Sequence, residues 1–197
     1  MDRMEQLASL AAETMRKNLI ITANDIATAL KGNDQQIIDS VVNAVQMALH
    51  EAVRWQKNGS KGPISYISFS FLQSNLLLNH YALRVDAWDE RFMIDDMESA
   101  AEWDFHTIFP CVSPDINAVA EKVRETVIRV QEYELRELER AYCLIYFTIA
   151  MDILKAVLSN NVELWKDSPA SLAPEVQFTL GAYMEPQQSI YIWRADR

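Results

Sequence analysis

The stretch that decides the fold runs from Asp115 to Ser159 and reads DINAVAEKVRETVIRVQEYELRELERAYCLIYFTIAMDILKAVLS. It contains neither Pro nor Gly over about 45 residues, and its apolar residues recur at helical spacing. The sequence therefore predicts one long helix, or two helices end to end. A straight helix would extend about 67 Å, whereas a compact chain of this size has a radius of gyration of about 16 Å. We expect a kink, a break near Tyr133 to Arg140, or a partner that covers the protruding end.

The two halves of this stretch differ in polarity. Residues 115–140 are charged and carry only a narrow apolar stripe, which suits a position at the surface or against a partner. Residues 141–158 are apolar around most of the helix, which is typical of a central core helix. Asp152 and Lys155 lie within this second half, and it is slightly short for a bilayer span of about 20 residues. We therefore expect a buried helix and no membrane contact.

Two helices are predicted before residue 60. The segment from Asp2 to Lys31 has helical spacing of its apolar residues, although Thr22 and Asp25 have the form of a capping box at which a second helix could begin. A polar stop at 32–34 separates this segment from another helix that ends near residues 55–58. Two such segments with a short polar turn predict a helical hairpin.

Strands are indicated wherever the spacing changes to two-residue alternation. These segments are Ile64 to Phe71, part of Leu76 to Asp89, Val176 to Met184, and Ser189 to Ala195. They predict two hairpins in a roughly four-stranded antiparallel sheet. The expected fold is a single helix-dominated α+β domain over residues 1–197, with the N-terminal helical hairpin and the long C-terminal helix packed on one face of that sheet.

Composition limits the classes of partner. The chain has 197 residues, is 50% hydrophobic by type, and carries a net charge of −10. This charge disfavours nucleic acid and anionic membranes, and it favours a basic protein or a cation. The two cysteines fit reduced thiols, and the acidic N-terminus does not resemble a signal peptide, so we expect a cytoplasmic protein.

Linear catalytic motifs do not fit this chain. The loop Gly59 to Gly62 lacks the spacing of a phosphate-binding loop, and a zinc-protease motif beginning at His50 would have Arg54 in place of its second His. The sequence therefore predicts no catalytic residue and no cofactor, and it favours a non-enzymatic role.

An acidic run between Asp95 and Asp104 raises the question of a metal. In an extended chain Glu102, Asp104 and His106 would point to one side, and two carboxylates with an imidazole can hold a divalent cation. A solvated acidic crossover accounts for the same residues without a metal, and this is the interpretation we adopt.

The strand alternation also predicts a sheet face rich in aromatic and polar side chains. The candidate residues for a ligand or partner are Tyr66, Arg84, Asp86, Trp88, Tyr183, Tyr191 and Trp193, joined by Ser68, Ser70, Gln177 and Thr179. Such a face suits recognition of another molecule. Ordinary strand propensity, stacking of two copies, or coverage by the acidic crossover would explain it equally.

Three functional hypotheses follow from these patterns. The first is a non-enzymatic cytosolic protein that acts through protein–protein interaction, as a homodimer formed by the long helix or the open sheet face. The second is a small-molecule-binding protein or an enzyme whose site lies between sheet and helices and uses Arg84 and Asp86. The third is an acidic inhibitor that contacts a basic protein through residues 86–104.

Overall fold

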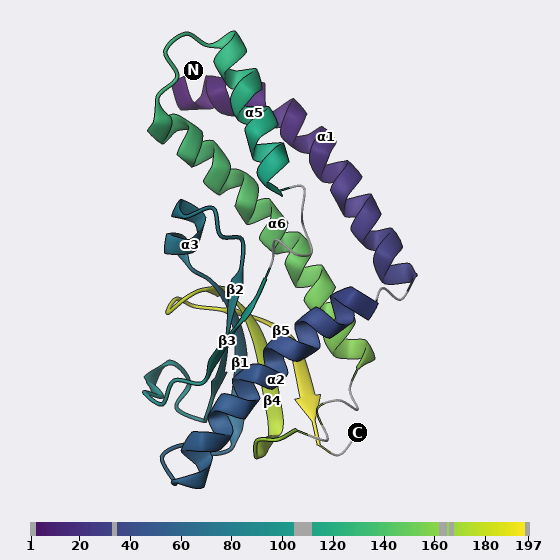
Figure 1. Ribbon diagram of the computed structural model, residues 1–197, viewed down its shortest axis with the longest axis vertical. Coiled ribbons are helices and arrows are strands. Elements are labelled where there is room, and N and C mark those ends of the chain that lie inside the picture. The colour runs from purple at the N-terminus through teal and green to yellow at the C-terminus, as the bar shows by residue number, and fades with distance from the viewer. Residues whose placement is uncertain (1–2, 33–34, 105–111, 162–164, 166–167, 196–197) are drawn as a thin grey trace.

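The structure is a computed structural model that describes the chain apart from residues 1–2, 33–34, 105–111, 162–164, 166–167 and 196–197. Its helices are α1 (Arg3–Lys31), α2 (Gln35–Lys57), α3 (Gln73–Leu77), η1 (Phe92–Ile94), α5 (Val112–Thr126) and α6 (Glu132–Asn160). Its strands are β1 (Ile64–Phe71), β2 (Leu83–Trp88), β3 (Ala100–Trp103), β4 (Leu172–Ala182) and β5 (Gln188–Arg194). The α+β class is therefore confirmed. Figure 1 shows a sheet with helices against it and a helical arm, made of α1, α5 and the first part of α6, that extends away from the sheet.

The stretch from Asp115 to Ser159 is two helices rather than one. The break lies at residues 127–131, before the predicted interval of 133–140, and α6 returns antiparallel to α5 (Figure 1). Arg129 takes a left-handed φ of 57°, which a non-glycine residue adopts at a cost. Gln131 then caps α6, and its backbone N–H donates to the Glu134 carboxylate at 2.7 Å. Gln is an uncommon N-cap residue and Arg rarely adopts a left-handed conformation, so the usual sequence signals for a turn are absent at these residues.

The first two helices do not form the predicted hairpin. Helix α1 is continuous through Thr22 and packs along α5 and α6, whereas α2 packs against β2 and β3 (Figure 1). Leu7 and Ala11 of α1 join Val119, Val123, Leu135 and Leu138 in a small apolar cluster within the helical arm. Each helix packs on the apolar surface that its own apolar stripe matches.

The sheet has five strands in the order β3-β2-β1-β4-β5, so the expected four antiparallel strands are wrong. All neighbouring pairs are antiparallel except β1 and β4, which are parallel. The missed strand, β3, is only four residues long and lies where an acidic crossover was expected. The direction in which β4 joins β1 depends on the path of the helices between them, and strand alternation carries no information about that path.

Residues 141–158 form the central core helix, as predicted. Their buried members are Tyr142, Cys143, Tyr146, Phe147, Ala150, Ile153, Leu154, Val157 and Leu158. The ring of Phe147 stacks on that of Phe71 in β1 with centroids 4.7 Å apart. In the described part of the chain α6 is the one helix long and apolar enough to span a membrane, and half of its most apolar window is buried inside the protein. That burial is typical of a core helix.

Candidate functional site

The sheet face opposite α2 is covered rather than open. Ser68, Asp86 and Trp88 are buried there beneath the segment 89–99, which we call the crossover. Phe92 of the crossover lies with its ring centroid 4.7 Å from that of Tyr66 and 6.3 Å from that of Trp88. The Trp88 indole N–H donates to the Ser68 hydroxyl at 2.7 Å. Of the interpretations that the sequence left open, this arrangement corresponds to coverage by the crossover.

The turn between β4 and β5 covers a second part of this face. The side-chain amide of Gln187 donates to the Ser70 hydroxyl at 2.8 Å and accepts a hydrogen bond from the Thr179 hydroxyl at 2.5 Å. Both hydroxyls are buried polar groups and are satisfied inside the protein. They are therefore not free to bind a ligand.

A buried ion pair fixes the crossover. The Lys61 ammonium lies 2.5 Å from the Asp95 carboxylate, and both side chains are fully buried. Asp95 also accepts the backbone N–H groups of Asp89 and Met97 at 3.2 and 3.0 Å. Burial by itself would raise the pKa of Asp89, but hydrogen bonds from Arg91 and the Gly62 N–H outweigh it and lower this pKa to about 2. Asp89 and Asp95 are thus structural groups, whereas the other acids of the crossover, Glu90, Asp96 and Glu98, are exposed.

Two of the candidate aromatic residues lie on the other face. In the β4–β5 register Trp193 is opposite Val176 and Tyr191 is opposite Phe178, so both aromatic side chains face the helix-covered core. The Tyr191 ring centroid is 5.7 Å from that of Phe178. Both alternating sets of residues in β5 contain large apolar side chains, so alternation alone assigned the wrong face.

Arg84, Asp86 and Tyr183 do come together. Arg84 donates through Nε to both oxygens of Asp86 at 2.9 Å and through its terminal nitrogen to Glu98 at 2.7 Å. Its guanidinium lies over the Tyr183 ring, 4.9 Å from the centroid. Burial raises the pKa of Asp86, and the bonds from Arg84 oppose that increase. The polar groups of this cluster are thus engaged with one another.

The candidate metal ligands are not assembled in the described residues. Glu102 lies 2.8 Å from the Nε2 atom of His80 instead. His106 falls outside the described residues, and the rest of the described chain holds no group of three side chains suited to a metal.

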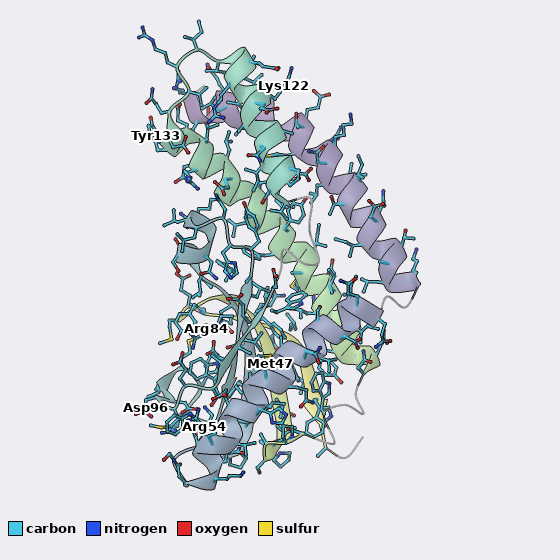
Figure 2. All side chains as sticks on the ribbon, in the orientation of Figure 1. Met47, Arg54, Arg84, Asp96, Lys122 and Tyr133 are labelled. Carbon is cyan, nitrogen blue, oxygen red and sulfur yellow. The ribbon has the colours of Figure 1, made fainter. Side chains whose placement is uncertain are left out.

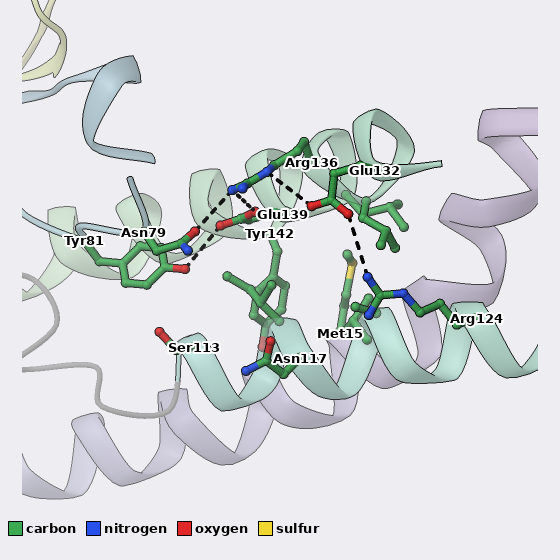
Figure 3. A pocket seen from close by; sticks show the side chains of 15 residues that line it. Met15, Asn79, Tyr81, Ser113, Asn117, Arg124, Glu132, Arg136, Glu139 and Tyr142 are labelled. Atoms are coloured by element: carbon green, nitrogen blue, oxygen red, sulfur yellow. Dashed lines mark hydrogen bonds and ion pairs between the residues drawn. The ribbon is translucent and has the colours of Figure 1, made fainter. Parts of the chain in front are cut away.

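A concave site lies elsewhere, between the helical arm and the segment that enters β2. This cleft has a volume of about 200 Å³. Its apolar lining comes from α1, α5 and α6, and consists of Met15, Ile116, Val119, Ala120, Leu135 and Leu138. Its polar lining, drawn with these residues in Figure 3, consists of Asn79, Tyr81, Ser113, Asn117, Arg124, Glu132, Arg136, Glu139 and Tyr142.

Helix α6 and the segment before β2 join at one wall of the cleft (Figure 3). The Tyr81 hydroxyl donates to Glu139 at 3.3 Å, and Arg136 donates to Glu139 at 3.2 Å and to the Asn79 side chain at 3.3 Å. Burial raises the pKa of Tyr81, so its hydroxyl stays protonated at neutral pH. Glu139 is therefore held by two donors.

A hydrogen-bond network between α5 and α6 supports the end of the cleft near α5. The carboxylate of Asp115, in the first turn of α5, accepts hydrogen bonds at 2.7 Å from the hydroxyls of both Tyr142 and Tyr146. These two hydroxyls lie 3.1 Å apart. The network fixes α5 against α6 and holds the Tyr142 ring in the cleft wall.

Two arginines from opposite walls face one carboxylate at the mouth of the cleft (Figure 3). Arg124 of α5 lies 3.8 Å from Glu132, and Arg136 of α6 lies 3.7 Å from it. Both distances exceed the usual range for a hydrogen bond between nitrogen and oxygen. All three side chains are exposed, so these pairs are loose.

None of the cleft residues was singled out from the sequence as a site. Residues 115–140, with their narrow apolar stripe, were interpreted as lying at the surface or against a partner, because a helical pattern shows which residues share one helix face but not which second helix lies opposite. The usable signal was the series of Arg124, Glu132, Arg136 and Glu139 around a narrow apolar stripe. It becomes a site only after α5 and α6 fold back on each other.

No family model matches this chain, and neither the curated proteins nor the solved structures contain a match.

Proposed function

We propose that this protein is a binding protein, without catalytic chemistry of its own, that holds a small organic ligand in the cleft between the helical arm and the segment entering β2. The observation that carries the proposal is the combination of an apolar floor with polar groups that converge from α5, α6 and residues 79–81. Small ligands usually bind in concave sites where an apolar surface meets convergent polar groups. This is the second of the sequence hypotheses, with the site moved from Arg84 and Asp86 to the cleft.

Filling the cleft tests this proposal. Ala120 lines the cleft on α5, and Ala118 is an exposed alanine on the same helix outside the cleft. We expect Ala120→Phe to weaken binding of the neutral probe 3-phenylpropanol at least tenfold, because the new ring occupies the apolar floor. Ala118→Phe should leave binding unchanged. The measurement is an NMR titration of backbone amide shifts, with the melting temperature of each variant as the check on folding.

The cleft proposal is abandoned if the wild-type amides around residues 116–120 and 135–142 show no shift up to millimolar probe. It also fails if Ala118→Phe and Ala120→Phe weaken binding equally.

A second candidate, protein–protein interaction, is supported by the tip of the helical arm. Ile128 and Tyr133 are 83% and 65% exposed at this tip, where Figure 2 shows Tyr133 at the outer end of the arm. Arg3 holds the turn by donating to the Arg129 carbonyl at 2.9 Å and pairing with Glu134 at 2.5 Å. These contacts hold the backbone of the turn in place, so less backbone entropy is lost when a partner binds there.

The homodimer expected from the sequence can be tested at this tip. Light scattering after size-exclusion chromatography should give the mass of a dimer for the wild type at micromolar concentration. The variant Ile128→Ser with Tyr133→Ser should give a monomer, because the apolar contact is lost. A wild-type chain that elutes as a compact monomer would contradict this candidate.

The hypothesis of an acidic inhibitor stays a prediction. Asp86, Asp89 and Asp95 are buried and paired with cations. A basic partner would have to contact the exposed acids of this segment instead, which are Glu90, Asp96, Glu98, Glu102 and Asp104.

A further inference from the structure

We infer that the ligand of the cleft is a small monocarboxylate with an apolar body, and that Glu132 competes with the ligand's carboxylate for Arg124 and Arg136. This inference rests on the proposed function and names the chemical class that the cleft selects. Three features of the cleft support it: the two arginines at its mouth, the engagement of Glu139, and the size and polarity of its floor.

The arginines converge on a position that suits a carboxylate. They extend from two different helices toward the same pair of oxygens on Glu132, at 3.8 and 3.7 Å. Planar guanidinium groups bind carboxylates through pairs of parallel hydrogen bonds at about 2.7–2.9 Å. Glu132 belongs to the exposed first turn of α6 and does not reach that distance to either arginine. A diffusible carboxylate has no such restraint and can approach both more closely.

The cleft is less suited to a cation. Glu139 is the less exposed of its two acids, and it already accepts hydrogen bonds from Tyr81 and Arg136. Glu132 is exposed at the rim, where a single ion pair contributes little to binding. An ammonium ligand would therefore find Glu139 already hydrogen-bonded and Glu132 too exposed to bind it strongly, and it would be repelled by the two guanidinium groups nearby.

A singly charged ligand fits better than a phosphate ester. Glu132 at the rim and Glu139 in the wall lie beside the two arginines, and the whole chain carries a net charge of −10. A dianion would be repelled by both the local and the overall charge. A carboxylate adds one negative charge and matches the group that already faces these arginines.

The floor sets the size of the ligand's body. It is made of Met15, Val119, Leu135 and similar side chains, with the Tyr142 ring in the wall. A dry cavity of about 150 Å³ accepts benzene, so a cleft of about 200 Å³ accepts one ring with a short chain. An arylalkanoate places its ring on this floor and its carboxylate at the mouth.

The experiment compares three probes that share one body: 3-phenylpropanoate, 3-phenylpropanol and 3-phenylpropylamine. Dissociation constants are measured by NMR titration for the wild type, for Glu132→Gln and for Glu137→Gln. Glu137 is an exposed acid on α6 outside the cleft, so Glu137→Gln controls for the change in net charge. We expect the propanoate to bind the wild type about tenfold more tightly than the alcohol, the effect of a partly exposed charge-assisted contact.

Glu132→Gln should strengthen propanoate binding about threefold to tenfold and leave alcohol binding unchanged, because it removes the competing carboxylate. Glu137→Gln should change neither. The inference is overturned if the amine binds best, if the propanoate has no advantage over the alcohol, or if Glu132→Gln has no larger effect than Glu137→Gln. In these cases binding of the alcohol, lost in Ala120→Phe, would still support the proposed function. If none of the three probes binds, both proposals fail.

Discussion

Replacing Asp95 with Ala is expected to lower the free energy of unfolding by about 3–5 kcal/mol, the range found when one partner of a buried ion pair is removed. The Lys61 ammonium would then remain fully buried, with its hydrogen bond to the Met97 carbonyl, at 2.7 Å, left in place. The backbone N–H groups of Asp89 and Met97 would lose their acceptor as well. Urea denaturation at pH 7 measures the effect.

The neighbouring residue provides the matched control. Asp96 is exposed and lies 3.8 Å from Arg91, so Asp96→Ala should change the free energy of unfolding by less than about 0.5 kcal/mol. A second control, Asp95→Asn, keeps an acceptor oxygen but removes the charge. Combining Lys61→Met with Asp95→Ala should restore part of the free energy of unfolding that Asp95→Ala loses, because no buried charge is then left unpaired. A loss below about 1 kcal/mol in Asp95→Ala would show that water reaches Lys61 and that the crossover does not seal this face.

The crossover also shows where sequence reasoning stops. The acidic run between Asp95 and Asp104 was interpreted as solvated because no basic residue lies within it, and of its five acids Asp95 alone is buried. Two cations pair with Asp95: Arg91, four positions before it and 3.2 Å away, and the fully buried Lys61, on the loop before β1 and 34 positions away. Pairing over such a distance depends on the antiparallel return of β2 beside β1. Local composition cannot reveal a partner that tertiary structure supplies.

The difference between what local sequence shows and what tertiary structure supplies also applies to the rest of the fold and to the cleft. Local sequence correctly predicted the helix of residues 141–158, which is apolar around most of its circumference and lacks Pro and Gly, and the strand Ile64–Phe71, which shows two-residue alternation. The turn at Arg129 was predicted several residues too late, and the parallel pairing of β1 with β4 was missed. Both depend on how elements meet. The cleft depends on the same relation, since its two arginines converge only across the turn between α5 and α6.

Two leucines of α6 give the most direct test of this packing. Leu154 is 0% exposed in the main core, and Leu144 is 43% exposed on the same helix. Leu154→Ala should lower the free energy of unfolding by about 3–4 kcal/mol, because it removes buried apolar contacts and leaves a cavity. Leu144→Ala should cost less than about 1 kcal/mol, since water already reaches that side chain. Denaturant titrations of both variants give the comparison.

The dependence of the unfolding midpoint on protein concentration distinguishes a monomer from an oligomer. If a second copy covers the outer face of α6, the midpoint of unfolding rises with concentration, and Leu144→Ala costs nearly as much as Leu154→Ala. If the chain folds alone, both midpoints are independent of concentration and the difference between the two leucines persists. If both substitutions cost less than about 1 kcal/mol without any dependence on concentration, the burial of Leu154 itself would be contradicted. The two leucine variants therefore test whether residues 141–158 are buried by their own chain. Such burial is expected of the apolar half of the Asp115 to Ser159 stretch.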